Sequence, residues 1–508
     1  TGFIGTKLQV HKPTRLYICF DEILQNDDVN FKRLGTIAAI TYDLKPGTRD
    51  LKPETWNLES IEPYTFRYMK IIVAEGDCTV EDVYLREYAN PDIYQASFTS
   101  SDDRLDRIFF AGLETFRQNA VDIFMDCPHR ERAGWLCDSY FTARVAQDVS
   151  GNSLIEKNFF ENFCLPDTFA FLPEGMLPMC YPADHNDGVF IPNWAMWFVV
   201  QLQEYLQRSQ DRELVDALKP KVMALLDYFE PFKNEDGLLE KLESWIFVEW
   251  SAANGFVQDV SYPTNMLYAA TLDIAGKLYG KKELILEAET IRKIILEQSF
   301  NGEFFVDNAK RSPKKELVIT ENTSEVCQYF AFYFGLATPQ SHPELWRKLS
   351  MEFGPARKDT KAYPTVHPAN SFVGNYLRLE LLSRYNLRSQ LLDESIEFFD
   401  YMARETGTLW ENISPAASCN HGFASHIVHV LYRDVLGISK VDVQNKEISF
   451  QFSELELEHC EGQMPIGDET ISLSWQRDEN TLTYQYEIPE GYYLIIKNIS
   501  KLKLIENN

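Results

Sequence analysis

The feature that most constrains the fold is a long run of helical patterns through the middle of the chain. Between residues 95 and 436, apolar residues recur with the 3.6-residue period of amphipathic helices, and polar or glycine-rich breaks separate the segments. Twelve helices in pairs make six hairpins, which can close into a ring of inner helices sheathed by outer ones. A helical array without ring closure is the alternative, and no fixed-period repeat of a solenoid is apparent. We expect the twelve helices at about 102–121, 132–149, 152–163, 191–208, 211–231, 262–280, 283–297, 322–336, 341–353, 371–387, 389–404 and 420–435.

Both ends of the chain carry strand patterns instead. Residues 1–94 hold short runs such as "TRLYICF" and "FRYMKIIVA", rich in β-branched and aromatic residues and separated by Pro, Gly, Asp and Asn. Residues 437–508 hold similar runs, among them "ETISLSWQR" and "NTLTYQYEIP". The sequence therefore predicts a multidomain protein with a central all-α (α/α)6 toroid, residues 95–436, between an N-terminal and a C-terminal β-sandwich. The N-terminal sandwich is short enough to lack its beginning.

Composition and charge argue against several classes of partner. With 508 residues, 45% of them hydrophobic, the chain can bury several large cores. Its net charge of −27 disfavours nucleic acid and anionic membrane surfaces. No run of about 18 apolar residues exists, so no membrane-spanning segment is expected. The first residues read as a strand and show no signal-peptide pattern. The compartment stays open, with a periplasmic or extracellular location slightly favoured.

The cysteines and acidic clusters do not form a recognisable metal site. The nine cysteines are scattered and odd in number, which argues against a disulfide scaffold. Cys127, His129 and Cys137 are close in sequence, but no second pair at zinc-site spacing follows them. The acidic clusters lack the spacing of a calcium-binding loop. We therefore expect neither a metal nor another cofactor.

The stretch "DCPHRERAGWLCD", residues 126–138, gathers charged residues between two apolar runs. If a helix begins just after Glu131, then Glu131, Trp135 and Asp138 follow the i, i+4, i+7 spacing and share one face. Asp126 lies just before them, in a proline-containing turn. A solvated acidic face at a helix N-terminus would have a similar composition. The tryptophan between two carboxylates favours a pocket, because solvated faces rarely place one there.

Tryptophan next to a carboxylate recurs in the helical region. Glu249 precedes Trp250, and Trp410 precedes Glu411. An indole can cover the apolar face of a pyranose while the carboxylate accepts hydrogen bonds from sugar hydroxyls. A single tryptophan is more often part of a core, so the repeated pairing carries the argument for sugar binding. His421, in "CNHG" at the start of the last predicted helix, is a further candidate for the same site.

The motif at 126–138 resembles the signature of bacterial α-L-rhamnosidases of glycoside hydrolase family 78. In that family an Asp-Cys-Pro-x-Arg-Glu-Arg stretch leads to Gly-Trp and then Asp. The segments "EPYTFRYMKI", "EGMLPMCYPAD", "IPNWAMWFV", "FVEW", "GTLWE" and "CNHGFASHIVHVLYRDVLGI" resemble further parts of the family pattern. The resemblance covers about residues 60–508. It implies an (α/α)6 barrel between β-sandwich domains and an inverting hydrolase for carbohydrates with terminal L-rhamnose.

Carried over residue by residue, the resemblance makes Glu131 the general acid and Glu411 the general base. Glu249 departs from the family pattern, in which an aspartate is expected before the tryptophan. Inversion requires two carboxyl groups roughly 6.5–9.5 Å apart, so that a water fits between the base and the sugar. A closed ring of hairpins would bring the early and the late glutamate together. The implied sugar-binding residues are Asp126, Arg130, Trp135, Asp138, Trp194, Glu249, Trp250 and His421.

Two other functions stay open at this point. An inverting exo-glycosidase for another sugar could share the fold, and a carbohydrate-binding homologue could keep the pocket without activity. The presence of both Glu131 and Glu411 favours an enzyme over a binding protein.

Overall fold

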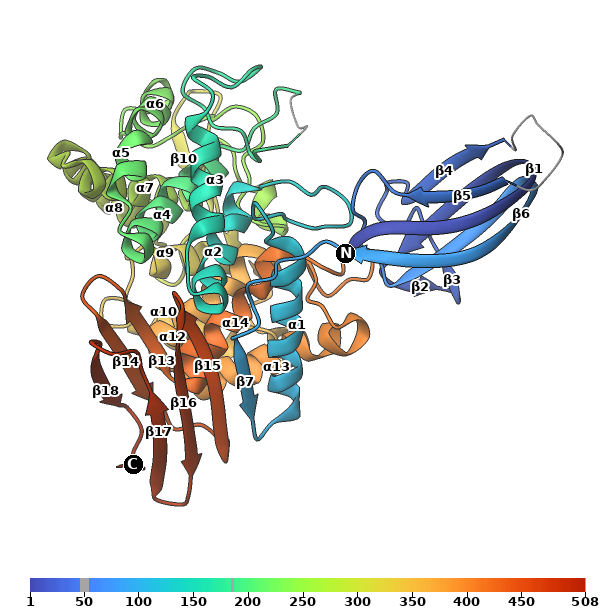
Figure 1. Cartoon of the computed structure of the whole chain (residues 1–508). Coiled ribbons are helices and arrows are strands. Elements are labelled where there is room, and N and C mark those ends of the chain that lie inside the picture. The colour runs from blue at the N-terminus through green and yellow to red at the C-terminus, as the bar shows by residue number, and fades with distance from the viewer. Residues whose placement is uncertain (46–53, 184–186, 508) are drawn as a thin grey trace.

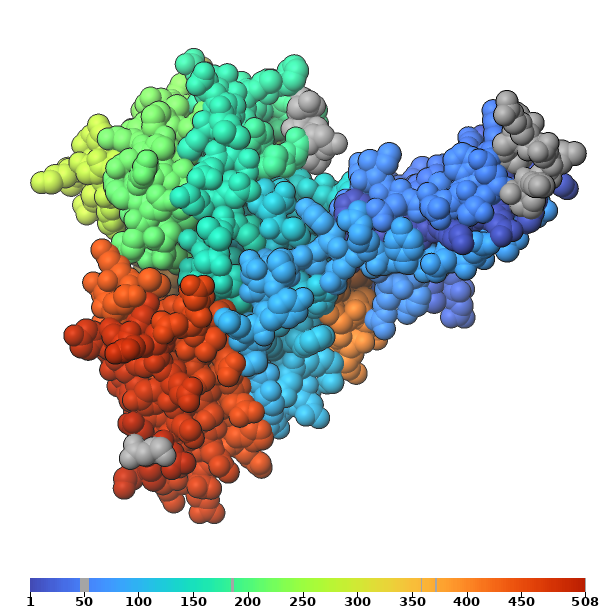
Figure 2. All heavy atoms as spheres, in the orientation of Figure 1, coloured from blue at the N-terminus to red at the C-terminus, as the bar shows by residue number. Residues whose placement is uncertain are grey.

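The computed structural model describes residues 1–45, 54–183 and 187–507. Three parts follow one another along the chain: an N-terminal sheet, a central helical body, and a pair of C-terminal sheets (Figure 1). The N-terminal sheet extends from one side of the helical body as an arm (Figure 2). The C-terminal sheets pack against the body itself (Figure 1).

The N-terminal part is built around the long strand β1 (Gly2–Asp21). Along one edge, β1 pairs with β6 (Tyr68–Glu87) over almost its whole length. Along the other edge it pairs with β4 (Ala39–Leu44) and β5 (Glu54–Glu59), and all these pairings are antiparallel. A short hairpin of β2 (Leu24–Gln25) and β3 (Asp28–Val29) follows β1. Whether this part is a sandwich stays a prediction, because the described residues form one four-stranded sheet and the hairpin.

The helical body confirms every predicted helical segment, with changes at some ends. The range 211–231 divides into two helices, and 371–387 begins with a kinked turn, η3 (Ser371–Asn375). The range 420–435 is a chain of three short segments: η4 (Gly422–Ser425), α14 (His426–Val430) and η5 (Leu431–Leu436). The other helices are α1 (Asp103–Asn119), α2 (Leu136–Ser150), α3 (Leu154–Cys164), α4 (Pro192–Ser209), α5 (Arg212–Ala217), α6 (Lys219–Phe229), α7 (Tyr262–Tyr279), α8 (Lys282–Ser299), α9 (Glu325–Tyr333), α10 (Pro343–Glu352), α11 (Arg357–Thr360), α12 (Tyr376–Arg384) and α13 (Arg388–Thr406).

Six of these helical segments contact one another in a cycle. In chain order, α2 packs against α4, α4 against α7, α7 against α9, and α9 against α12. The last segment meets α12 through a hydrogen bond between His426 and Glu380, and it returns to α2. Residues in α2, α4, α7 and α9 are buried almost all round. Helices that are buried on all sides belong to the interior of a protein, whereas α8 and α13 keep exposed polar faces.

The C-terminal part consists of two sheets against the end of the helical body. One contains β13 (Ile438–Asp442), β14 (Glu447–Phe452) and β18 (Tyr493–Asn498). Trp475 of the other sheet donates a hydrogen bond to the carbonyl oxygen of Leu436, which anchors that sheet on the last helical segment. Its five strands are β7 (Ser97–Ser100), β15 (His459–Ile466), β16 (Glu469–Arg477), β17 (Thr481–Glu487) and β19 (Lys503–Glu506).

Short strands in the loops complete the fold. They form a three-stranded sheet of β8 (Val260–Ser261), β9 (Asn308–Arg311) and β10 (Leu317–Ile319), and a parallel pair of β11 (Thr323–Ser324) and β12 (Val366–His367). Among the residues that the structure describes, no helix combines the length and apolar character needed to cross a bilayer.

Candidate active site

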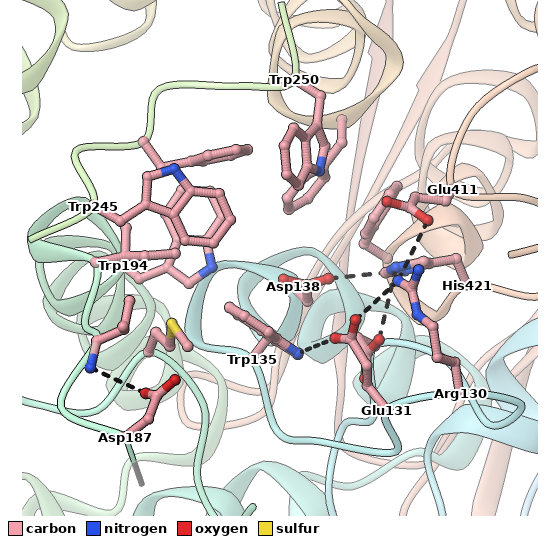
Figure 3. Close-up of a pocket in the computed structure, with 17 residues that line it drawn as sticks. Arg130, Glu131, Trp135, Asp138, Asp187, Trp194, Trp245, Trp250, Glu411 and His421 are labelled. Atoms are coloured by element: carbon pink, nitrogen blue, oxygen red, sulfur yellow. Dashed lines mark hydrogen bonds and ion pairs between the residues drawn. The ribbon is translucent and has the colours of Figure 1, made fainter. Parts of the chain in front are cut away.

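A cavity of about 440 Å³ opens beside the first turns of α2 and α4 (Figure 3). Nine of the ten predicted site residues line it: Asp126, Arg130, Glu131, Trp135, Asp138, Trp194, Trp250, Glu411 and His421. They come from the loop after α1, the starts of α2 and α4, the loop before β8, and the segment between α13 and α14. The structure therefore brings distant parts of the chain to one cavity.

The loop after α1 carries Glu131, and here one prediction was wrong. Helix α2 begins at Leu136 and not near residue 132, so Glu131, Trp135 and Asp138 do not form a helical stripe. The backbone N–H of Asp126 donates to the carbonyl of Ala133, and the N–H of Ala133 donates to the Asp126 carboxylate, each at 3.0 Å. These bonds close a loop around residues 127–132 and leave Glu131 on it.

Glu131 meets Trp135 across this loop. The indole Nε1 of Trp135 donates to Glu131 Oε2 at 2.9 Å. Gly134 makes the arrangement possible, because a Cβ at this position would lie 2.6 Å from the carbonyl oxygen of Tyr181. Tyr181 in turn donates its N–H to the Gly134 carbonyl. The segment "EGMLPMCYPAD" thus runs beside the Gly-Trp step, and its last residue, Asp184, lies outside the described residues.

Arg130 links the two predicted catalytic glutamates. Its Nη2 lies 2.9 Å from Glu131 Oε1 and 3.8 Å from Glu411 Oε2 (Figure 3). The two carboxylate oxygens therefore cannot be further apart than these two distances combined. Burial raises the pKa of Glu411, and the positive charge of Arg130 opposes that rise.

Two aspartates flank His421 at the floor of the cavity. His421 Nε2 lies 4.0 Å from Asp126 Oδ2, and Nδ1 lies 3.8 Å from Asp138 Oδ1. Burial raises the pKa of Asp126 and of Asp138, and neighbouring carboxylates add to the rise. Burial also lowers the pKa of His421 well below its ordinary value, and Arg130 lowers it further. The group can thus hold protons on its carboxyls and offer a neutral imidazole.

Aromatic side chains form the opposite wall (Figure 3). Phe247 packs edge-to-face against Trp194 and Trp250, with ring centroids 4.7 and 4.9 Å apart. Trp250 is 47% exposed, whereas Trp194 is buried and its Nε1 makes no hydrogen bond within the described residues. Sequence reasoning missed Trp245 and Phe247, although both stand in "SWIFVEW", where aromatic residues are dense.

Glu249 is the one predicted residue that the structure does not bring into the cavity. Its buried carboxylate accepts hydrogen bonds from the backbone N–H groups of Asn370 at 3.2 Å and Gly374 at 3.0 Å. Burial raises its pKa to about 8. Glu249 therefore holds the 370–374 turn, from which Phe372 reaches the cavity wall.

In residues 1–45, 54–183 and 187–507, no group of three or more His, Cys, Asp or Glu side chains has the arrangement of a metal site. His129, which is close in sequence to Cys127 and Cys137, places Nδ1 2.7 Å from the carbonyl oxygen of Thr65. Cys127 donates its thiol to the Asp126 carboxylate.

A comparison with protein families matches residues 94–435 to the bacterial α-L-rhamnosidase six-hairpin glycosidase domain. The chain belongs to this family. The match covers most of the chain and confirms the resemblance that the motif at 126–138 indicated. The rhamnosidase-family domain ends where the C-terminal strands begin.

Similar proteins agree with this membership. An α-L-rhamnosidase of Formosa agariphila is 22% identical over an alignment of 475 residues, and the match covers 85% of this chain and 47% of that protein. The crystal structure of a family 78 rhamnosidase of Bacillus sp. GL1 superposes with a TM-score of 0.85 at 18% identity, over 100% of this chain and 53% of that one. A Streptomyces avermitilis α-L-rhamnosidase complexed with L-rhamnose gives a TM-score of 0.70 at 16% identity, over 97% of this chain and 47% of that one. The chain thus spans about half the length of these relatives.

Proposed function

We propose that this rhamnosidase-family chain hydrolyses terminal α-L-rhamnosides with inversion at the anomeric carbon. The observation that carries the proposal is the pair Glu131 and Glu411, which approach the same guanidinium at one side of a cavity walled by aromatic rings. Rhamnosidase relatives, one of them solved with L-rhamnose, support the choice of sugar.

In this mechanism Glu131 is the general acid. It protonates the glycosidic oxygen as the bond to the leaving group breaks, and its bond from Trp135 orients the carboxyl. Glu411 is the general base and takes a proton from the water that attacks the opposite face of the sugar. Arg130 favours the ionised form of Glu411 that this role requires.

The two contacts with Arg130 set an upper limit on the distance between the Glu131 and Glu411 carboxylate oxygens. This limit allows the lower end of the roughly 6.5–9.5 Å typical of inverting enzymes. It also allows the roughly 5–5.5 Å typical of retaining enzymes. Stereochemistry is therefore the property that the experiment below measures.

Asp126, Asp138 and His421 are proposed to bind the sugar hydroxyls. Carboxyl oxygens and a neutral imidazole nitrogen can accept or donate according to the hydroxyl that they face. The oxygens of these carboxyls also present partial negative charge to the ring, which favours the positive charge that develops in the oxocarbenium-like transition state. Trp250 and Trp194 are proposed to cover the C6 methyl of L-rhamnose. Such a wall prefers a methyl over a hydroxymethyl by about 1–3 kcal/mol.

The cycle of inner-helix contacts supports an (α/α)6 toroid as the scaffold of this site. In a closed ring, the segment after α1 and the segment before α14 become neighbours, which is where the two glutamates lie. We further propose the division into a β-sandwich at 1–94, the toroid at 95–436 and a β-sandwich at 437–508. The pairing of β7 with β15 ties the start of the helical part to the C-terminal sheets.

The experiment combines a substrate screen with a stereochemical assay. Purified protein is incubated with nitrophenyl glycosides of several sugars, and proton NMR follows the anomeric signal during the first turnovers. We expect hydrolysis of the α-L-rhamnoside and initial release of β-L-rhamnose. Faster hydrolysis of another glycoside would replace the substrate assignment with a different exo-glycosidase. Initial release of the α-anomer would establish retention and remove Glu411 from the role of base.

A further inference from the structure

The N-terminal sheet holds a buried charged cluster where it meets the helical body. Arg33, in the turn after β3, has a side chain only 2% exposed. Its Nη2 lies 2.8 Å from Asp21 Oδ1 and 2.7 Å from Glu22 Oε2, and both carboxylates are buried as well. Burying three ionised groups is costly unless each is paired. In this cluster, both carboxylates pair with Arg33, which offsets that cost.

The same cluster binds the backbone of the loop that begins at Glu411. Arg33 Nη1 donates to the carbonyl oxygens of Pro415 at 2.8 Å and Ala417 at 2.6 Å. Glu22 Oε2 accepts the backbone N–H of Cys419 at 2.9 Å. Three backbone groups of a loop without regular secondary structure are therefore held by two side chains from another part of the molecule.

This loop is closed on Glu411 itself. The backbone N–H of Glu411 donates to the carbonyl oxygen of Ser418 at 3.0 Å. Ser418 lies between Ala417, whose carbonyl Arg33 binds, and Cys419, whose N–H Glu22 binds. A shift of residues 417–419 would therefore move the backbone of Glu411 with them.

The loop that carries Glu131 also contacts the N-terminal part, at the segment between β5 and β6. His129 contacts the carbonyl of Thr65, and Arg132 donates to the carbonyl of Pro63 at 3.1 Å. Arg132 also pairs with Glu62 at 2.6 Å. Glu131 and Glu411 are far apart in sequence, but the loops that carry them both contact the N-terminal part.

We propose that Arg33, clamped by Asp21 and Glu22, is a positioning residue that sets the place of Glu411 relative to Glu131. This inference rests on the proposed roles of the two glutamates. Arg33 does not line the cavity, so its effect passes through the 415–419 backbone. A misplacement of about 1 Å in a catalytic group can cost on the order of a hundredfold in rate.

The test compares Arg33→Lys with Arg67→Lys. A lysine at 33 keeps the charge that Asp21 and Glu22 require, but one ammonium cannot reach both carboxylates and both loop carbonyls as the guanidinium fork does. Arg67 is the matched control, because it lies in the same part of the chain and donates to the Glu405 carbonyl, outside the 411–419 loop. Each variant is assayed for kcat and KM on an aryl and an alkyl α-L-rhamnoside, for rhamnose-binding stoichiometry, and for Tm.

For Arg33→Lys we expect kcat to fall about tenfold to a hundredfold on both substrates. KM should stay within about twofold, with rhamnose still binding at one site per chain, because the sugar-binding residues are untouched. The stoichiometry excludes an inactive fraction as the cause of the lower kcat. Arg67→Lys should match the wild type.

A wild-type kcat in Arg33→Lys would overturn the proposal, and so would a loss of kcat that merely follows a loss of rhamnose-binding sites. If Arg33→Lys does not fold, Asp21→Asn decides. It removes the charge of one of the two carboxylates that hold Arg33 and leaves the 415–419 loop untouched. An unchanged kcat in this variant would again overturn the proposal. A wild-type protein inactive on every rhamnoside would instead refute the proposed function.

Discussion

Arg130 contacts both glutamates and can therefore influence the ionisation of both. It pairs with Glu131 at 2.9 Å and lies 3.8 Å from Glu411. An acid must carry a proton and a base must lack one at the same pH. Burial raises the pKa of Glu411, and Arg130 counters this by favouring the ionised form. In the proposed mechanism, Glu131 has to leave its contact with Arg130 before it can protonate the leaving oxygen.

Glutamine at each of the two positions should give a different pattern. Glu131→Gln should lower kcat/KM on alkyl rhamnosides by about 10²–10⁴, because an alcohol needs a proton to leave. It should spare aryl rhamnosides with acidic phenols. Glu411→Gln should lower kcat/KM equally on both kinds of substrate, because the activation of water does not depend on the leaving group. Azide should restore turnover of this variant and give a β-configured glycosyl azide.

The control for this pair is Glu297→Gln, a change on the exposed face of α8 that should leave both rates unchanged. Equal losses on both substrates for Glu131→Gln would remove it from the role of acid.

At this scale, nine of the ten residues predicted from the sequence lie in one cavity, and Glu249 lies outside it. The sequence shows that Glu249 and Trp250 are adjacent, but it does not show that their side chains point to different neighbours. Trp250 faces the cavity, which leaves Glu249 facing the 370–374 turn. The backbone N–H groups that bond to Glu249 lie about 120 positions away in sequence. The residues around Glu249 do not predict these hydrogen bonds.

At the scale of the elements, the 370–374 turn has an irregular backbone. Val373 has φ 73°, a conformation that β-branched residues rarely adopt. Phe372 stacks on Phe423 with ring centroids 4.0 Å apart, and both rings line the cavity. The two hydrogen bonds to Glu249 span the irregular residues. They offset the strain and hold Phe372 in the wall.

Glu249→Gln should change how stability depends on pH. Burial raises the pKa of Glu249 to about 8 from an ordinary 4.5. Between these values the folded state keeps a proton that the unfolded chain has lost, so stability is lost as pH rises through this window. Glutamine resembles the protonated carboxyl and cannot titrate. The fall in the free energy of unfolding from pH 5 to pH 8 should therefore be smaller in the variant, by at least about 1 kcal/mol.

Urea titrations at pH 5 and pH 8 measure this difference, with the exposed Glu297→Gln as control. Parallel changes in wild type and Glu249→Gln would show that Glu249 is ionised in the folded protein.

The helices themselves were predictable because their apolar period is long and regular. The start of α2 was not, because Asp126 and Ala133 bond to each other across the loop and delay the helix to Leu136. A loop closed by a carboxylate and a backbone N–H competes with the first helical turn. The sequence pattern alone cannot decide between the two.

At the scale of the whole molecule, two separate cores divide the chain. One continuous core runs from Ile93 to Leu502 and joins the helical body to the C-terminal sheets. The N-terminal sheet has a much smaller core, formed by Ile4, Leu8, Val10, Leu16, Ile18, Phe20 and Leu44. Its contacts with the body include polar ones at Arg33, Arg67 and Arg132. Such an interface couples two parts less tightly than a shared apolar core does.

Equilibrium unfolding in urea should therefore occur in two steps. Trp56 in β5 packs against the small core, and Trp475 in β16 belongs to the large one. Each signal is isolated by subtracting the fluorescence of the matching Trp→Phe variant. The Trp475 signal should change together with the helical circular dichroism, because both report the same core. The Trp56 signal should change at lower urea, because less apolar surface stabilises that sheet.

Rhamnosidase activity should be lost with the Trp56 signal rather than with the helical signal. Arg33 and Glu22 lie in the connections that follow β3 and β1, and they hold the loop of Glu411. Unfolding of the N-terminal part therefore releases that loop while the cavity floor and the helices stay intact. Rhamnose binding measured in the same samples should outlast activity, because Asp138, Trp194 and His421 belong to the helical body. Superimposed transitions for all signals would mean that the polar interface couples the two cores fully. Activity that survived the loss of the Trp56 signal would show that the sheet is dispensable for placing the base.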